Sequence, residues 1–414
     1  MSDLRAAARE AYGYVLPLIE IAAVRARGLA VGSPMNAFAS MRHLASHRSR
    51  AVTTPNNDTL YATAQLDLSE GPITLTVPAS GQRYVSLQLM DAWSNSFAVL
   101  GTRTTGPDGG TFRLVGPGDP ATPAPDLIRS PTRHVWALAR ILVTGPEDLE
   151  AARLVQAGFT AQGPAVPEQM VCARRSDPWP DYFASADALM AANPPPATDL
   201  ALLRRIAPLG LGEGRFDPSA FSAEQARAIA EGVEAARGAI RHAGGLAGGA
   251  VVDGWAYPLP ALGDFRQDYG LRAAVALSGL AALPLVEASY PQAGGPDGGL
   301  FDGHRRWRLH LPADRQPPCG SFWSLSLYEA TPDGQFFFTD NPLERYALGD
   351  RSPGLVWNPD GSLDLWMSHE SPGPEREANW LPAPAGPFTL FLRAYLPRPE
   401  LLDGRYRLPA VEAV

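Results

Sequence analysis

One nine-residue stretch combines turn-forming residues with side chains suited to acid–base chemistry. It runs from Thr53 to Tyr61 and reads TTPNNDTLY. Proline pre-sets its φ angle, and Asn and Asp side chains bond nearby backbone or tolerate left-handed conformations, so the stretch predicts a sharp turn. A carboxylate can act as a general base, and a phenol as an acid or hydrogen-bond donor. We therefore take Asp58 and Tyr61 as candidate catalytic residues and Asn57 as a candidate substrate contact.

The residues after this turn alternate with the period of a strand. Leu60, Ala62, Ala64, Leu66 and Leu68 share one face, and Tyr61 lies on the other, polar face. One interpretation is a structural Asx-turn before a solvated strand face. The other is that Asp58 and Tyr61 face a ligand pocket, because functional residues concentrate on loops held by a rigid scaffold.

Further candidates are aromatic and arginine side chains near expected strand ends and loops. They are Trp93, Arg103, Tyr269, Arg272, Trp323, Arg345 and Trp380. Small-molecule pockets combine mostly apolar walls with a few polar groups, so these residues are candidate substrate contacts, with Arg103 or Arg272 as an anion clamp. The competing interpretation is that the tryptophans pack in the core, that Arg345 clamps a loop, and that Arg272 snorkels to the surface.

Metal and cofactor sites have no clear counterpart in the sequence. Of the seven histidines, His43 and His47 alone have a helical i, i+4 spacing, and Cys172 and Cys319 lie far apart. No Gly-x-Ser-x-Gly elbow or phosphate-binding Gly-x-x-x-x-Gly-Lys loop is present. We expect no metal and no cofactor.

Composition limits the class of partner. The chain has 414 residues, 45% of them hydrophobic, and a net charge of −8 without a Lys/Arg-rich run, which argues against nucleic acid. The longest uncharged apolar run, Ala273 to Val286, is shorter than the roughly 20 residues of a membrane-spanning helix. We expect a cytoplasmic protein that acts on a small-molecule ligand away from membranes, and a homo-oligomer stays open.

Patterning divides the chain into four regions. Residues 1–50 show helical spacing, and residues 51–145 alternate between turns, which predicts an antiparallel β-rich domain. Residues 146–300 form a mainly helical segment in which Ser222 and Gln225 make a capping box. Alternation returns in residues 301–414, which predicts a C-terminal β-sandwich or jelly roll. The expected fold class is α+β, with two antiparallel β-rich domains and an intervening helical segment.

Short motifs occur in order along nearly the whole chain. They are PNNDTLY (55–61) with LDL (66–68), DAWSN (91–95), GTRTTG (101–106), SPT (130–132), FWSL (322–325), NPLERY (341–346), NWLPAP (379–384) and LRAY (392–395). This series resembles a bacterial two-domain family known as domains of unknown function 1254, in the N-terminal half, and 1214, in the C-terminal half. The resemblance implies a two-domain protein and carries no general activity.

Two features depart from the family pattern. The family's Asn-x-Phe-x-His pattern reads Asn36-Ala37-Phe38-Ala39-Ser40 here, so a role for that histidine does not transfer. Some members carry secretion signals, whereas the apolar stretch from Ala11 to Ile19 is short and contains Pro17. We therefore expect no signal peptide.

Three classes of function follow from these residues. The first is a cofactor-independent enzyme that acts on a small organic molecule by acid–base chemistry. The second is a non-catalytic binding protein for a sugar or aromatic compound stacked on tryptophan. The third is a structural protein whose aromatic residues are all core.

Overall fold

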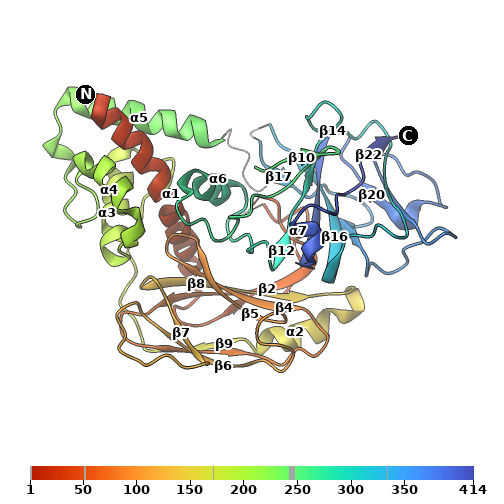
Figure 1. The fold of residues 1–414 in the computed structure, drawn as a ribbon, viewed down its shortest axis with the longest axis horizontal. Helices are drawn as coiled ribbons and strands as arrows, with labels where there is room; N and C mark the ends of the chain where they lie inside the picture. The colour runs from red at the N-terminus through yellow and green to blue at the C-terminus, as the bar shows by residue number, and fades with distance from the viewer. Residues whose placement is uncertain (1, 51–52, 171, 242–247, 333) are drawn as a thin grey trace.

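The elements form three groups in space (Figure 1). The computed structural model describes residues 2–50, 53–170, 172–241, 248–332 and 334–414. The N-terminal strands lie below, the C-terminal strands lie to the upper right, and most helices lie to the upper left. The fold is α+β with mainly antiparallel sheets, as predicted.

Two sheets form the N-terminal group. The larger has the strand order β1-β2-β8-β4-β5 and the smaller β7-β6-β3-β9. Their bounds are β1 (Ala39–Ser40), β2 (Thr59–Asp67), β3 (Ile73–Val77), β4 (Val85–Asp91), β5 (Ser96–Gly101), β6 (Gly110–Val115), β7 (Leu127–Arg129), β8 (His134–Leu142) and β9 (Thr160–Gln162). The predicted apolar face of β2 is buried against the smaller sheet, so this part of the strand prediction is confirmed. The β6–β7 pair is parallel.

The helices pack mainly around one long N-terminal helix. Their bounds are α1 (Ser2–Ala30), α2 (Leu149–Ala157), α3 (Trp179–Ala192), α4 (Leu200–Ile206), α5 (Ala223–Arg241), α6 (Tyr269–Ser278) and α7 (Pro399–Leu402). Helix α1 contacts α3, α4, α5 and α6, whereas α2 lies on the N-terminal sheet. Pro17 lies inside α1, which runs on through it because its buried faces are held by these helices.

The capping box at the start of α5 is present as predicted. Ser222 N donates to Gln225 Oε1 at 2.8 Å, and Gln225 N donates to Ser222 Oγ at 3.3 Å. The predicted helical segment, 146–300, includes residues 242–247, which lie outside the described residues, as do residues 51 and 52 of the predicted N-terminal β domain.

Two further sheets form the C-terminal group, and a shared apolar core lies between them. The larger contains nine strands and curls into a half-barrel, and the smaller has the order β20-β19-β15-β22. Their bounds are β10 (Val251–Val252), β11 (Trp255–Ala256), β12 (Ala288–Ser289), β13 (Gln292–Ala293), β14 (Phe301–Asp302), β15 (Trp307–Leu311), β16 (Cys319–Ala330), β17 (Phe336–Phe337), β18 (Ala347–Gly349), β19 (Leu363–Ser368), β20 (Trp380–Pro382), β21 (Pro387–Pro397) and β22 (Val411–Ala413).

Strands β10 to β13 come from the segment expected to be mainly helical, yet they join the C-terminal sheet. Each has two residues, so none shows the alternation by which a strand is recognised in sequence. The domain boundaries and the jelly-roll closure stay predictions.

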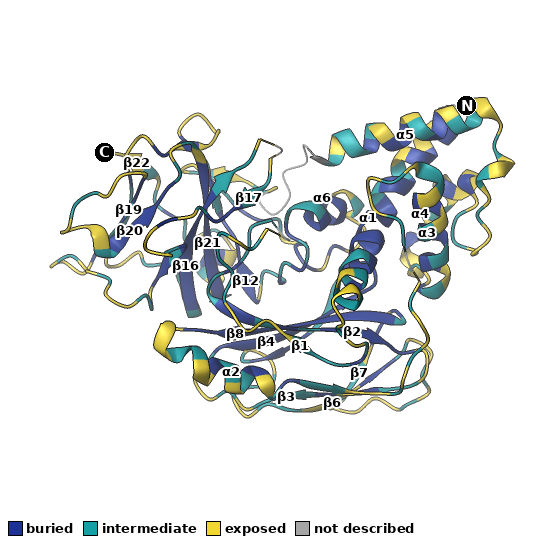
Figure 2. Ribbon diagram, turned by 180° about the vertical axis from the view of Figure 1, so that it is seen from behind, coloured by how far each residue is buried: buried dark blue, intermediate teal, exposed yellow. Residues whose placement is uncertain are grey.

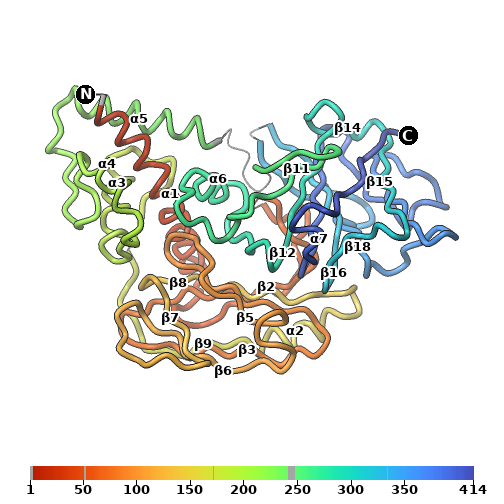
Figure 3. Tube along the Cα trace, in the orientation of Figure 1, coloured from red at the N-terminus to blue at the C-terminus, as the bar shows by residue number. Residues whose placement is uncertain are grey.

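The two β groups meet through a buried apolar layer. It includes Tyr84 and Leu142 from the N-terminal sheet and Phe322 and Tyr395 from the C-terminal sheet. Figure 2 shows β4, β8, β16 and β21 as largely buried strands on either side of this layer. Figure 3 shows the chain from α6 to β12 passing between the two β groups. Any pocket at this boundary therefore receives residues from both halves of the chain.

Candidate functional site

An open cleft with a volume of about 610 Å³ lies at the boundary between the two β groups. Its walls come from the turn before β2, the end of β8, strand β16 and the segment 343–353 that contains β18. Four of the predicted site residues line it, namely Asn57, Asp58, Trp323 and Arg345. The cleft is thus built jointly by residues that lie almost 300 positions apart.

Asp58 is held in the cleft wall by its own turn and by the C-terminal sheet. Asn56 Oδ1 accepts a hydrogen bond from Asp58 N at 2.6 Å, which is the predicted Asx-turn. Ser324 Oγ donates to Asp58 Oδ2 at 2.6 Å. Burial raises the pKa of Asp58, while the positive charges of Arg393 and Arg351 and the Ser324 hydrogen bond oppose the rise. The surroundings of Asp58 therefore favour its protonated form more than water does.

A second carboxyl group and a guanidinium follow β18 on the same cleft wall. Asp350 Oδ1 accepts from Trp323 N at 3.3 Å, and its pKa is raised by burial and further by the charge of Asp58, against the influence of Arg351. Arg351 lies with Cζ 4.0 Å from the centre of the Phe322 ring and Nε 3.8 Å from Asp350 Oδ1. Two carboxyl groups and one cation therefore share the cleft.

The remaining predicted residues of the cleft have structural contacts. Asn57 Nδ2 donates to Ala45 O at 2.5 Å, and Arg345 Nη1 donates to Trp380 O at 3.0 Å and to Glu377 O at 2.5 Å. Arg345 thus clamps the loop before β20, and burial lowers its pKa. Trp323 is 3% exposed and belongs to the C-terminal core.

Tyr61, Arg103 and Trp380 lie away from the cleft. Tyr61 packs against an apolar cluster that includes Ile21 of α1 and Trp136 of β8. Arg103 Nε pairs with Glu287 Oε2 at 2.5 Å. Trp380 is buried, and its Nε1 donates to Ser368 O at 3.0 Å. Tyr61, Trp93 and Arg103 therefore do not line the cleft that contains Asp58.

Trp93, Tyr269 and Arg272 form a separate buried cluster beside α1. The Arg272 guanidinium lies 5.2 Å, 5.5 Å and 5.3 Å from the ring centres of Tyr14, Trp93 and Tyr269. Arg272 is 1% exposed, so the expectation of a snorkelling surface arginine is wrong. Aromatic ring faces attract a cation, which explains how α6 accommodates this charge in its interior.

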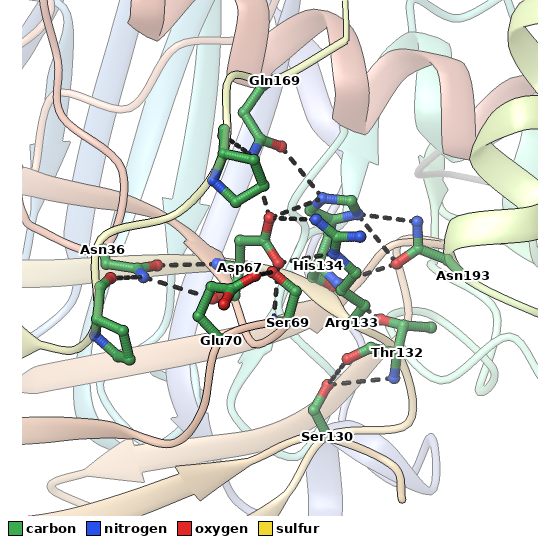
Figure 4. A network of polar contacts seen from close by, with 12 residues as sticks. Asn36, Asp67, Ser69, Glu70, Ser130, Thr132, Arg133, His134, Gln169 and Asn193 are labelled. Atoms are coloured by element: carbon green, nitrogen blue, oxygen red, sulfur yellow. Dashed lines mark hydrogen bonds and ion pairs between the residues drawn. The ribbon is translucent and has the colours of Figure 1, made fainter.

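A fully buried carboxylate, Asp67, organises a different polar network (Figure 4). Arg133 Nε and Nη2 donate to its two oxygens at 2.7 and 2.8 Å, and Gln169 Nε2 donates at 3.0 Å. Burial acts to raise the pKa of Asp67, but hydrogen bonds from Arg133 and His134 bring it well below its usual range. Both carboxylate oxygens of Asp67 accept hydrogen bonds from protein donors. We therefore infer a structural role for this network, which joins β2 and β8 to the segment before α3.

Sequence reasoning missed Ser324, Asp350 and Arg351. Ser324 was visible as a polar residue in the alternating FWSL motif, and Asp350 and Arg351 follow Gly349 as a charged pair at a strand end. The sequence does not show that these residues lie near Asp58, because their proximity depends on how the two halves of the chain pack together.

Within the described ranges, no three His, Cys, Asp or Glu side chains are grouped to hold a metal ion. His43 and His47 lie in a loop and not on the helix face that their spacing suggested. His47 Nδ1 is 2.8 Å from the Tyr346 hydroxyl. The absence of a metal and a cofactor stays a prediction. Among the helices of the described residues, none is long and apolar enough to cross a membrane.

Comparison with solved structures shows a protein of similar fold. The fold is similar to that of the VPA0106 protein from Vibrio parahaemolyticus, with a TM-score of 0.74, 21% identity, and coverage of 99% of this chain and 100% of that one. An uncharacterized protein from Burkholderia cenocepacia gives a TM-score of 0.49 at 15% identity over 98% of this chain and 88% of the other. No curated protein matches.

Two family profiles match the chain in the expected order. The family described as "Protein of unknown function (DUF1254)" matches residues 35–163, which include Asp58. The family described as "Protein of unknown function (DUF1214)" matches residues 287–399, which include Ser324, Asp350 and Arg351. The chain therefore belongs to the two-domain family of proteins of unknown function that combines DUF1254 with DUF1214.

Proposed function

We propose that the protein is a cofactor-independent enzyme that acts on a small organic molecule in the cleft by acid–base chemistry. The observation that carries this proposal is the position of Asp58, a partly buried carboxyl group on the wall of the cleft whose pKa is raised. Perturbed carboxyl groups in clefts are candidate general acids and bases, because catalysis is most efficient when the pKa approaches the working pH.

Asp58 is the proposed general base. The Ser324 hydroxyl donates to its Oδ2 atom at 2.6 Å and so fixes the orientation of the carboxylate. In this orientation Asp58 would take a proton from the substrate. General acid–base catalysis of this kind typically contributes about 10²- to 10⁴-fold to a rate. Tyr61 lies outside the cleft, so Asp350 replaces it in our proposal as the second proton-transfer group.

Arg351 is the proposed anion clamp of the cleft. It lies on the cleft wall over the Phe322 ring, and its Nε is buried with no hydrogen-bond partner among the described residues. A preorganised cation can stabilise negative charge that develops on a substrate during proton abstraction. Arg351 takes the role for which Arg103 and Arg272 were considered, since those two side chains are engaged elsewhere.

The proposal is tested with Asp58→Asn and a matched control, Asp91→Asn, which changes another buried carboxyl group outside the cleft. Each variant and the parent are screened against small organic acids, esters, sugars and aromatic compounds for turnover and for ligand-induced thermal stabilisation. We expect turnover in the parent and in Asp91→Asn, and its loss in Asp58→Asn with the melting temperature nearly unchanged.

The outcomes separate the classes of function. Ligand stabilisation without turnover in all three proteins would support the alternative, a non-catalytic binding protein for a sugar or aromatic compound. Turnover that survives in Asp58→Asn would remove Asp58 from the chemistry. No ligand response in any protein would leave the cleft without a binding role.

We further infer that the protein works in the cytoplasm. Cys172 and Cys319 are free thiols, which suits a reducing compartment. Cell fractionation tests this location. Light scattering of the purified protein decides whether it forms a homo-oligomer.

A further inference from the structure

Five side chains meet inside the boundary between the two β groups, apart from the walls of the cleft. We call them the inner cluster; they are Tyr61, Arg140, Tyr290, Arg393 and Tyr395. Tyr61 lies on β2, Arg140 on β8, and Arg393 and Tyr395 on β21. Both arginines are nearly inaccessible, with exposed fractions of 5% for Arg140 and 4% for Arg393. Two cations are therefore buried at the place where the two halves of the chain join.

Their mutual interactions show that these five side chains share one environment. The Arg140 guanidinium lies 5.5 Å from the centre of the Tyr61 ring. Burial raises the pKa of Tyr290, and the nearby charges of Arg140 and Arg393 oppose that rise. Burial likewise raises the pKa of Tyr395, with Tyr290 and Tyr61 adding to it. Tyr290 is therefore close enough to both arginines to feel their charges, and Tyr395 is close to both Tyr290 and Tyr61.

The arginines contact neutral acceptors. Arg140 Nη1 donates to Gln88 Oε1 at 2.8 Å, and its Nη2 donates to Ala281 O at 2.6 Å. No carboxylate lies within 4.0 Å of Arg140 among the residues that the structure describes. Its charge is therefore not neutralised by a direct ion pair.

Arg393 has the same kind of surroundings. Its Nη1 donates to Ser326 Oγ at 2.8 Å, and its Nη2 donates to Thr54 O at 3.0 Å. Thr54 has a φ angle of 51°, an unusual conformation for a β-branched residue. Asp58 is close enough to affect Arg393 electrostatically, but among the described residues the two form no ion pair within 4.0 Å, and Asp58 itself accepts a hydrogen bond from Ser324.

The tyrosine hydroxyls add further donors. Tyr395 Oη accepts from Asn56 Nδ2 at 2.6 Å, and Tyr290 Oη accepts from Leu283 N at 3.2 Å. Because each oxygen is occupied as an acceptor, each hydroxyl proton is left to donate. The inner cluster therefore has an excess of donors and of positive charge.

We propose that the inner cluster binds the anionic group of a small molecule, a carboxylate or a phosphate. Such a group supplies several acceptor oxygens and a negative charge, which are the two properties that the cluster lacks. Buried charges are normally paired, and arginine forks match carboxylate and phosphate oxygens. Tyr61 is partly exposed whereas the other four side chains are buried, so we expect a ligand to approach the cluster past Tyr61.

This site goes beyond the proposed chemistry in the cleft and does not depend on it. The cleft contains Asp58, Asp350 and Arg351, whereas no member of the inner cluster lines it. Asp58 lies within electrostatic reach of Arg393, so a bound anion is expected to raise the pKa of Asp58 further by placing a negative charge nearby. The two sites can therefore be tested separately.

Sodium acetate and sodium phosphate serve as probes, titrated calorimetrically into the full chain at constant ionic strength. We expect at least one of them to bind at one equivalent and to raise the melting temperature. Acetate binding alone indicates a carboxylate ligand, and phosphate binding alone indicates a phosphate ester.

Tyr61→Phe and Tyr290→Phe each remove one hydroxyl donor and keep the ring. Each should weaken binding of the probe by about tenfold, as expected for a hydrogen bond to a charged group. Tyr182→Phe, a buried tyrosine in the helical group whose hydroxyl bonds Tyr12 O, should bind like the parent.

Arg140→Gln and Arg393→Gln should abolish binding; if either variant fails to fold, the two phenylalanine variants decide the question. The proposal is overturned if neither probe binds. It is also overturned if a probe binds the parent, Tyr61→Phe and Tyr290→Phe with equal affinity, because the ion would then lie elsewhere.

Discussion

Ser324 and Asp58, 266 positions apart, are joined by a hydrogen bond of 2.6 Å between the serine hydroxyl and the aspartate Oδ2. It connects the C-terminal sheet to the turn before β2. Since each residue falls within a different family profile, the contact makes the cleft a property of the two halves together.

Ser324→Ala should raise the pKa of Asp58 further. The hydroxyl bonds the ionised carboxylate and so favours it, and its removal favours the protonated form. If Asp58 must be ionised to act, the acid side of the pH–rate profile should move to higher pH. Carbon-13 NMR titration of the aspartate carboxyl groups measures the same shift without a substrate. Ser368→Ala, on β19, is the control, and equal titration of parent and Ser324→Ala would contradict the assignment.

The Arg83–Asp148 pair should make stability depend on pH in the acid range. Arg83 Nη1 and Nη2 donate to the two Asp148 oxygens at 2.6 Å, and this pairing lowers the pKa of Asp148 from 3.8 to about 2. The stabilisation is complete above pH 4 and is lost as the pH falls towards 2. Arg83→Gln should reduce the free energy of unfolding near pH 7 by on the order of 1 kcal/mol, because solvent screens this partly exposed pair and the hydrogen bond from Thr144 N to Asp148 remains. Urea unfolding at several pH values tests this. Arg215→Gln is the control. It removes one partner of an exposed ion pair with Glu213 and should change the free energy of unfolding little.

Asp91→Asn should make the protein less sensitive to pH between 4 and 7. Burial raises the pKa of Asp91 to about 6, from 3.8, so its ionisation opposes folding above pH 6 and this penalty disappears as the pH falls below 4. Asparagine keeps an oxygen that accepts from Trp93 N and Asn95 N, as Asp91 Oδ1 does at 2.9 Å. The melting temperature at pH 7 should therefore be unchanged or higher. A lower value together with an unaltered pH slope would show that the charged form is needed.

Trp93→Ala should destabilise the protein without affecting ligands of the cleft. Trp93 is 1% exposed in the core around α1, and removing a buried large aromatic typically costs about 3–5 kcal/mol. Trp357, which is 42% exposed, provides the control when changed to alanine. If folded Trp93→Ala protein no longer responds to a ligand that stabilises the parent, Trp93 takes part in ligand binding and the prediction is wrong.

We expect the purified protein to hold no stoichiometric transition metal. The expectation rests on the absence of three suitably spaced ligands in the sequence. Elemental analysis tests it. One equivalent of zinc, iron or copper that resists chelation would contradict it, and His43 and His47 would be the first residues to change.

Local patterns were sufficient to predict several elements. The alternation from Leu60 to Leu68 identified the buried face of β2, and Ser222 with Gln225 identified the start of α5, because both signals depend on residues a few positions apart. A proline inside a helix removes a backbone hydrogen bond and normally kinks or breaks it, yet α1 continues through Pro17 because tertiary packing overrides this local preference. The overall α+β class could be predicted because the β-rich parts repeat the period of two over many residues.

The site was predicted less completely, since it depends on distant contacts. Asp58 and Asn57 were found in the cleft, but Asp350 and Arg351 reach it through the pairing of β18 with β16. Trp93 and Arg272 resembled ligand contacts by residue type alone. Arg272 is buried where α6 packs against α1, and Trp93, from the turn between β4 and β5, packs in the same core; neither arrangement is encoded in the local segment.

The position of α1 also has a consequence for synthesis of the chain. Ala8, Ala11 and Val15 of α1 are 0% exposed in a core that includes Ile229 and Val233 of α5 and Ala273 of α6. At typical rates of translation, about 5–20 residues per second, α6 leaves the ribosome on the order of ten to fifty seconds after α1. During that interval the faces of α1 that contact α5 and α6 have no native partner, so nascent chains that end before α5 should bind chaperones or aggregate, and ribosome-bound chains extended past α6 should not.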